Sequence, residues 1–172
     1  MFLIKKNNLF KMKFVRNLSL LNNFRKIENK ELLWLSTDEA RNRSFIWGNE
    51  NIENDYYLEK SLDNSKYLRT IGVTKFLEKC EGLPGYVHGG ATCSILDELT
   101  GVCCYANRLN SMTGSLKVEY IQPVKLNTKL IVKSEITKIE ENKIYVSAQM
   151  SDLTDLDNIY VKSENIYKLL KK

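Results

Sequence analysis

The spacing of apolar residues changes near the middle of this 172-residue chain. Between Gly90 and Asn107 apolar residues recur at helical spacing, in the order Ala91, Ile95, Leu99, Val102, Cys103 and Ala106. A stripe sustained over this whole stretch predicts one long amphipathic helix, interrupted only at Gly101. One of its faces must be buried against another element of the fold.

After this helix the pattern becomes β-like to the end of the chain. Alternation and β-forming residues predict four antiparallel strands over 115–124, 128–140, 143–153 and 158–170, joined by short connections. Upstream, residues 65–73 are rich in β-formers and predict the first strand, and the glycines and proline of 79–86 predict a loop. Residues 31–62 have weak periodicity, which favours one or two short helices and irregular chain. The predicted fold is α+β, with a curved antiparallel sheet wrapped around one long central helix.

Charge is concentrated at the N-terminus. Residues 1–27 contain seven of the 26 basic residues and no acidic ones. This segment, with Phe10, Phe14, Leu18 and Leu21 at helical spacing, fits either an organelle transit peptide or a disordered or docking helix. We therefore expect an intracellular protein, mitochondrial or in another organelle under the first interpretation and otherwise cytoplasmic.

The predicted organisation is a targeting or flexible segment at 1–30, an N-terminal extension at 31–64 and the folded domain at 65–172. Outside the basic segment the chain is nearly neutral, which argues against a nucleic-acid partner. No apolar run is long enough to predict a transmembrane helix. The four cysteines form no C-x-x-C pair and there is one histidine, so we expect reduced thiols and no metal site.

The candidate chemistry lies in residues 85–98, GYVHGGATCSILDE, where the helix is predicted to begin. If Gly89 and Gly90 form its first turn, their N–H groups lack intrahelical acceptors and the helix dipole adds partial positive charge there. Such donors can stabilise an oxyanion, and glycine leaves the backbone open to a substrate carbonyl. The alternative is a tight loop-to-helix turn without a ligand.

Two carboxylates follow within the helix, at Asp97 and Glu98. Asp97 lies to one side of the buried stripe, where a carboxylate can activate water or attack a substrate directly. The alternative is a solvated acid on a helix face. The spacing from the His-Gly-Gly sequence favours Asp97 over Glu98 as the catalytic acid.

Taken together, G-x-x-HGG-A-x-x-x-x-x-D at the helix start and T-x-x-L-x-V-x-Y-x-x-P on the following strand resemble the hotdog-fold acyl-CoA thioesterases. The resemblance is closest to the phenylacetyl-CoA thioesterase-like branch, which includes the thioesterase superfamily members. It covers residues 65–170 and is densest in GLPGYVHGGATCSILDELTGV and TGSLKVEYIQPV. It implies hydrolysis of an acyl-CoA to a free acid and coenzyme A, with coenzyme A as part of the substrate and no separate cofactor.

The resemblance also implies roles for individual residues. Asp97 would face the oxyanion glycine of another subunit in a homodimer or a dimer of dimers, and His88 would help form the thioester pocket. Thr113 stands where related enzymes place a Ser or Thr near the attacking water, although a threonine at a strand start is also ordinary. Asn142 and Lys143 fall at a turn whose counterpart approaches the coenzyme A phosphates, although a lysine at a hairpin turn is common.

One departure from the family pattern concerns the residues beside Tyr120. Close relatives often carry Asn and Lys around this tyrosine, whereas this chain has Glu119 and Ile121. An acidic side chain directed at the coenzyme A phosphates would repel them. This supports an alternative, a non-catalytic hotdog module that binds acyl-CoA, lipid or a protein. A hydratase on the same fold is less consistent with a sole histidine placed before two glycines.

Overall fold

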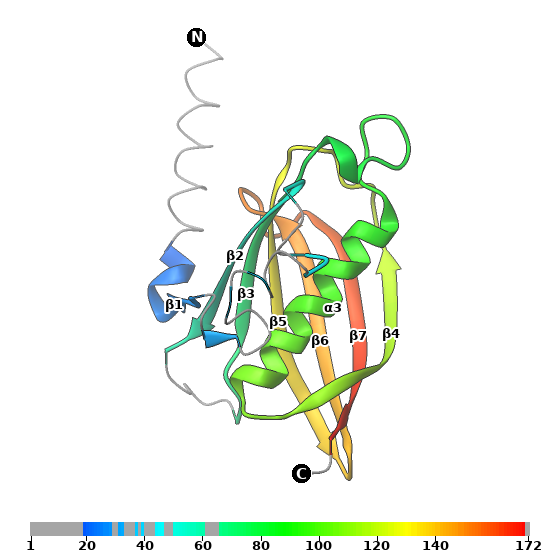
Figure 1. The fold of residues 1–172 in the computed structure, drawn as a ribbon. Helices are drawn as coiled ribbons and strands as arrows, with labels where there is room; N and C mark the ends of the chain where they lie inside the picture. Colours follow the sequence, from blue (N-terminus) through cyan, green and yellow to red (C-terminus); the bar gives the residue numbers. More distant parts are fainter. Residues whose placement is uncertain are drawn as a thin grey trace.

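The computed structural model describes residues 19–28, 31–32, 37, 39, 44–46, 50–60 and 66–170. Seven strands form one antiparallel sheet, and one long helix, α3 (Gly89–Ala106), lies across one face of it (Figure 1). The strands are β1 (Phe24–Lys26), β2 (Ile52–Glu59), β3 (Thr70–Phe76), β4 (Ser111–Tyr120), β5 (Lys129–Glu140), β6 (Lys143–Asp152) and β7 (Ile159–Leu169), with short 3-10 helices η1 (Ser19–Asn23) and η4 (Glu78–Cys80). The predicted α+β hotdog architecture is confirmed.

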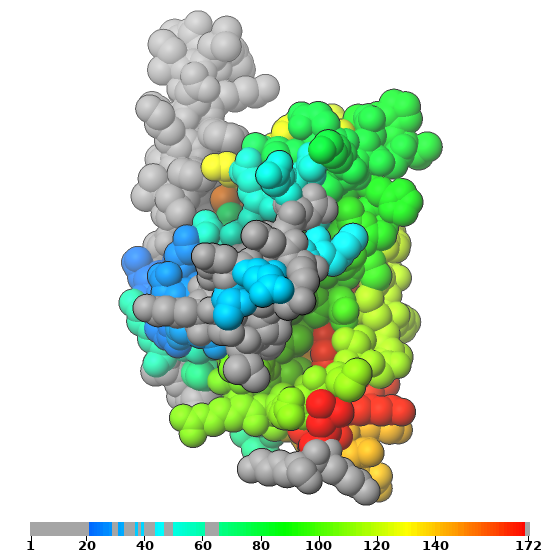
Figure 2. Space-filling view, viewed as in Figure 1, coloured from blue at the N-terminus to red at the C-terminus, as the bar shows by residue number. Residues whose placement is uncertain are grey.

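The order of strands across the sheet is β1-β2-β3-β5-β6-β7-β4. After α3 the chain runs along one edge as β4, then crosses to β5 beside β3 and returns through β6 and β7. Within the described part of the chain β4 pairs only with β7, so its other edge is open. Figure 2 shows the yellow-green atoms of β4 at the margin of the molecule.

Helix α3 buries more of its circumference than a single stripe. It begins at Gly89, one residue earlier than predicted, and passes through Gly101 without interruption. Leu96, Thr100 and Cys104 are buried in addition to the predicted stripe, because the curved sheet covers the flanks of the helix as well as its base. At the centre of the contact, a Cβ on Gly72 of β3 would lie 3.3 Å from the Leu99 side chain, so glycine permits this close approach.

The prediction of short helices over 31–62 is wrong for its last part, which forms β2. This strand pairs with β1 and β3 and buries Ile52, Tyr56 and Leu58. The residues Glu-Asn-Asp within it lower its intrinsic strand propensity, so the pairing partners decide its conformation. The strand predicted at 65–73 is shifted and begins at Thr70.

The sheet therefore starts before residue 65, where the sequence pattern placed the start of the folded domain. Residues 24–26, within the segment predicted to be targeting or flexible, form β1. Most of the basic segment, residues 1–18, lies outside the described residues. Within the described part of the chain, no helix is both long and apolar enough to cross a membrane.

Candidate active site at the start and middle of helix α3

The first turn of α3 is capped by His88. Its backbone is extended (φ −62°, ψ 134°), and its ring Nδ1 accepts a hydrogen bond from the Gly90 N–H at 3.0 Å. An imidazole nitrogen that accepts a hydrogen bond carries no proton, so the neutral ring has its proton on Nε2. The exposed edge of His88 therefore presents a donor to solvent.

Gly89 provides the open donor of this turn. The Ala91 and Thr92 N–H groups both donate to the His88 carbonyl, and the Gly90 N–H is taken by the His88 ring. The Gly89 N–H has no acceptor among the described residues. Of the two predicted oxyanion donors, Gly89 is thus free and Gly90 is engaged in capping.

Tyr120, at the end of β4, holds this turn from the other side. Its Oη donates to the Gly89 carbonyl at 2.9 Å, and burial raises the pKa of this phenol, with a further contribution from Cys93. The tyrosine was quoted in the sequence motif but had no contact assigned to it. Its hydrogen bond ties the end of β4 to the start of α3.

The loop before His88 is fixed by backbone contacts that the sequence pattern did not specify. The His88 N–H donates to the Cys80 carbonyl at 2.7 Å, and the Val87 N–H donates to the Val124 carbonyl at 2.9 Å. A Cβ on Gly82 would lie 2.9 Å from the His88 Cα, so this position requires glycine. The glycines of the predicted loop were the only available signal for this packing.

Asp97 lies two turns further along α3 and is half-buried. Its Oδ1 accepts hydrogen bonds from Thr113 Oγ1 on β4 at 2.8 Å and from Tyr167 Oη on β7 at 3.2 Å. No hydrogen bond from a described residue reaches Oδ2. One carboxylate oxygen is thus held by two strands while the other is open.

Glu98 points elsewhere. Burial raises the pKa of Tyr56 on β2 well above its usual range, and the charge of Glu98 adds to this effect. Glu98 therefore lies on the side of the helix that faces β2, whereas Asp97 faces β4 and β7. The structure brings Thr113 together with Asp97 and separates the two adjacent carboxylates.

Tyr167 and Thr100 were missed by the sequence analysis. Tyr167 is 2% exposed, and burial together with the charge of Asp97 raises the pKa of its phenol far above the usual range. Thr100 is fully buried and its Oγ1 lies 2.8 Å from Tyr167 Oη. The alternation of β7 predicts an inward Tyr167, but only the tertiary structure brings it to Asp97.

The open Gly89 N–H and Asp97 are far apart within one chain. They are separated by eight residues of helix, which at 1.5 Å per residue is about 12 Å along the axis. A thioester is too small for its carbonyl carbon to be reached by groups this distant. A single chain therefore presents two halves of a potential site.

Glu119 does not face this region. It lies opposite Lys162 in the β4–β7 register and lines a groove of about 700 Å³ on the sheet face away from α3. Tyr120, the next residue, points toward α3 and contacts Gly89. Glu119 is therefore not positioned to repel a ligand bound near α3.

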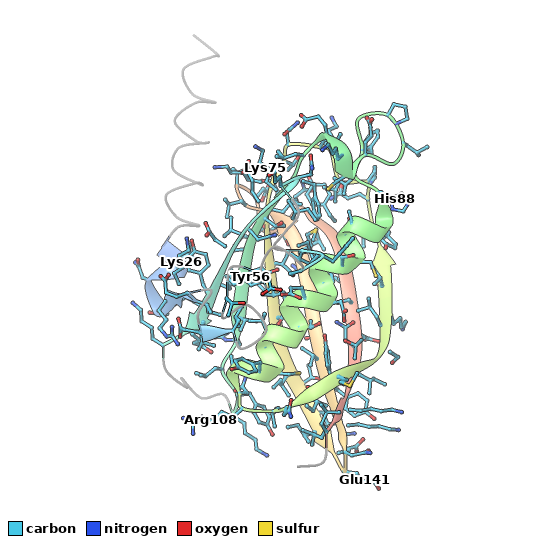
Figure 3. The ribbon with its side chains drawn as sticks, in the orientation of Figure 1. Lys26, Tyr56, Lys75, His88, Arg108 and Glu141 are labelled. Atoms are coloured by element: carbon cyan, nitrogen blue, oxygen red, sulfur yellow. The ribbon has the colours of Figure 1, made fainter. Side chains whose placement is uncertain are left out.

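Asn142 and Lys143 lie at the hairpin between β5 and β6, beside Glu141. Figure 3 shows Glu141 at the opposite end of the molecule from His88. The Asn142 carbonyl accepts from the Leu169 N–H at 2.8 Å, which closes this end of the sheet. Within one chain these residues are not brought together with Gly89 or His88.

The cysteines are all free, as expected for reduced thiols: Cys80, Cys103 and Cys104 are buried and Cys93 is half-buried. Burial and the neighbouring Cys103 raise the pKa of the Cys104 thiol to about 12, which makes it a poor nucleophile. Within the described ranges, no cluster of three or more His, Cys, Asp or Glu side chains could hold a metal ion.

This chain is similar in sequence to known thioesterases. Residues 84–157 match the Thioesterase superfamily. The acyl-coenzyme A thioesterase THEM4 of Mus musculus is 31% identical over 99 residues, which is 58% of this chain and 42% of that protein. The chain thus matches less than half the length of this curated relative.

Two solved structures have the same fold. Zebrafish thioesterase superfamily member 2 has a TM-score of 0.61 at 12% identity, covering 77% of this chain and 92% of that one. A Streptococcus mutans protein bound to acetyl CoA has a TM-score of 0.56 at 17% identity, covering 60% and 82%.

Proposed function

We propose that this protein hydrolyses acyl-CoA thioesters to a free acid and coenzyme A, because residues 84–157 match the Thioesterase superfamily. The observation that carries the proposal is a single helix with an unused N–H at Gly89 and an anchored carboxylate at Asp97. The name of the mouse relative, an acyl-coenzyme A thioesterase, supports the reaction class. Coenzyme A enters as part of the substrate, and no separate cofactor is needed.

In this proposal the Gly89 N–H stabilises the oxyanion that forms on the thioester oxygen. The donor stands at the positive end of the α3 dipole and has no competing acceptor. Gly90 contributes by donating to His88 Nδ1, which leaves the Nε2–H of His88 directed outward toward the same substrate. His88 thus frames the thioester pocket and caps the helix.

Asp97 is the proposed acid-base residue. Its open Oδ2 either takes a proton from the attacking water or attacks the thioester carbon directly, and Thr113 holds the other oxygen. After a single turnover in H₂¹⁸O, label on Asp97 would establish direct attack, whereas label found only in the product acid is consistent with both routes. Only direct attack and hydrolysis of the anhydride can leave the label on Asp97.

Because one chain separates the two halves, the complete site requires a second copy. The open edge of β4 carries exposed Met112 and Tyr120, an arrangement that favours pairing with another strand. Thr113, bound to Asp97, lies near the start of β4, and Tyr120, bound to Gly89, lies at its end. Antiparallel pairing of two β4 strands about a two-fold axis near Leu116 brings Asp97 of one copy toward Gly89 of the other.

This arrangement supports a homodimer with two equivalent composite sites. The same axis brings the Asn142–Lys143 hairpin of one copy to the end of the molecule where the other carries His88, which agrees with the predicted contact to coenzyme A phosphates. Association of dimers into a tetramer and an organelle location remain predictions from the sequence.

The test is release of free thiol from a panel of acyl-CoAs. The wild-type protein should turn over at least one chain length, and Asp97→Asn should lower turnover about 10²–10⁴-fold because an amide is neither base nor nucleophile. The matched control is Glu98→Gln, which neutralises the adjacent carboxylate that faces β2 and should leave turnover unchanged. Acyl-CoA binding without turnover in the wild type would instead support the non-catalytic module.

A further inference from the structure

A group of buried polar side chains lies directly beneath Asp97, between α3 and β7. Tyr167 Oη lies 2.8 Å from the Asp97 carbonyl oxygen, 3.2 Å from Asp97 Oδ1 and 2.8 Å from Thr100 Oγ1. Asn165 precedes Tyr167 by two residues, on the same face of β7, and its Nδ2 donates to Thr100 Oγ1 at 2.8 Å. Thr100, Asn165 and Tyr167 are at most 2% exposed.

The number of protons in this group favours a bond from Tyr167 to Asp97. The Thr100 hydroxyl has its own acceptor, the Leu96 carbonyl one turn earlier, at 2.7 Å. The single proton of Tyr167 is thus shared between two acceptors on Asp97, the backbone carbonyl at 2.8 Å and Oδ1 at 3.2 Å, and the charge of an ionised carboxylate favours the bond to Oδ1. The Asn165 amide donates to Thr100, which keeps the Thr100 oxygen in place under Tyr167.

The group is also poorly explained by packing alone. Asn165 Oδ1 is buried and has no hydrogen-bond partner among the described residues. Leaving such an acceptor unpaired costs about 1–3 kcal/mol. An apolar side chain at 165 would avoid that cost but would remove the donor to Thr100.

We propose that Tyr167 is a positioning residue that, together with Thr113, fixes Asp97 Oδ1 and so leaves Oδ2 as the only reactive oxygen. The proposal rests on the proposed thioester hydrolysis. Thr113 reaches Oδ1 from β4 and Tyr167 reaches it from β7, so the carboxylate is held by donors from two strands. Two donors on one oxygen restrict rotation of the Asp97 side chain, and reaction rates depend steeply on such alignment.

The first test is Tyr167→Phe, which removes the hydroxyl and keeps the ring. We expect kcat for acyl-CoA hydrolysis to fall about tenfold with KM changed less than twofold, because alignment of the attacking group is lost while substrate contacts remain. In an Asp97→Asn background the same change should have no further effect on residual turnover. Tyr145→Phe, which removes a phenol hydroxyl from a ring beside Lys138, should change neither parameter.

A merely structural role for Tyr167 predicts a different outcome: a loss of similar size in both backgrounds, accompanied by lower stability. That result, or unchanged kcat in Tyr167→Phe, overturns the proposal. If Tyr167→Phe does not fold, Thr100→Val replaces it as the probe. This change removes the hydroxyl under Tyr167 and should lower kcat two- to threefold, whereas Thr100→Ser should retain wild-type kcat.

A second measurement does not depend on activity. Three-bond couplings to the Asp97 Cγ in the NMR spectrum of the full-length protein report whether its χ1 occupies one staggered rotamer or several. We expect one rotamer in the wild type and in Tyr145→Phe, and averaging in Tyr167→Phe. If the wild-type protein hydrolyses no acyl-CoA but Tyr167→Phe shows rotamer averaging at Asp97, the proposed function is refuted and the positioning of Asp97 by Tyr167 is supported. If the Asp97 rotamer is unchanged in Tyr167→Phe, the positioning is refuted.

Discussion

Replacing Gly89 with proline removes the backbone N–H from the proposed oxyanion site and changes little else. Proline lacks the N–H that we assign to the oxyanion, and the first helical position is where a helix tolerates proline best. The residue before proline must be extended, and His88 already is, with φ −62° and ψ 134°. The Gly90 N–H and its bond to His88 are unaffected by the change.

The steric effect of the Cβ that proline adds at position 89 can be measured separately. A Cβ at position 89 would lie 3.3 Å from Tyr120 Oη, and the tyrosine is 53% exposed in the single chain, so its tip can move by the few tenths of an ångström required. Gly89→Ala adds the same Cβ and retains the N–H. It is therefore the matched control for crowding against Tyr120.

The expected effect is a loss of about 10²–10³ in kcat for Gly89→Pro relative to Gly89→Ala, the range for removal of one oxyanion donor. The free energy of unfolding should change by less than about 1 kcal/mol, since the helix geometry accepts proline. The assay is thiol release from acyl-CoA at saturating substrate, with urea unfolding of the same samples. Turnover of Gly89→Pro within about threefold of Gly89→Ala would refute the assignment of Gly89.

The same variant tests whether the site is shared between two copies. Gly89→Pro and Asp97→Asn chains are each expected to have at most about 1% of wild-type turnover, but a mixed dimer contains one site with both groups intact. When equal amounts are unfolded together and refolded, half of the dimers are mixed, so about a quarter of wild-type activity should return. No recovery in samples shown to contain mixed dimers would contradict a site built from Asp97 and Gly89 of different chains.

Two further predictions concern stability. His88→Ala should lower the free energy of unfolding by about 1 kcal/mol because the helix loses its cap, whereas His88→Asn should keep most of it, since asparagine also caps well; urea unfolding distinguishes the two, and equal losses would contradict the capping role. For Glu59, burial raises the carboxyl pKa, but hydrogen bonds and charge from Arg69 outweigh this and set it below its usual range. The pair therefore stabilises the fold above the pKa of the unfolded carboxyl and loses this contribution as pH falls through the lower folded pKa. Glu59→Gln should be less stable than the wild type by about 1 kcal/mol at pH 7, because Arg69 is half-exposed, and the difference should shrink as the pH falls below about 4. A difference that is constant with pH would contradict this linkage, and Glu53→Gln, which removes an exposed partner of Lys75, is the control.

The sequence by itself determined the elements with strong periodicity. The stripe from Ala91 to Ala106 defined α3 to within one residue, since a long helix is specified by local spacing. The alternation after residue 115 defined four strands for the same reason. The His-Gly-Gly sequence followed by Asp97 also indicated the candidate site, because a helix start and a carboxylate on the same helix need only local geometry.

Tertiary structure decided what depends on partners distant in the chain. Strand β2 has a weak pattern and exists because β1 and β3 supply its hydrogen bonds. Gly89 and Gly90 look equivalent in the sequence. Only the orientation of the His88 ring in the fold engages the Gly90 N–H and leaves the Gly89 N–H without an acceptor among the described residues. Tyr167 lies 70 residues from Asp97, and the sheet order alone brings β7 beneath the helix at that point. Local patterns therefore set which residues are candidates for the chemistry, and long-range packing set which of their hydrogen-bonding atoms have no partner among the described residues.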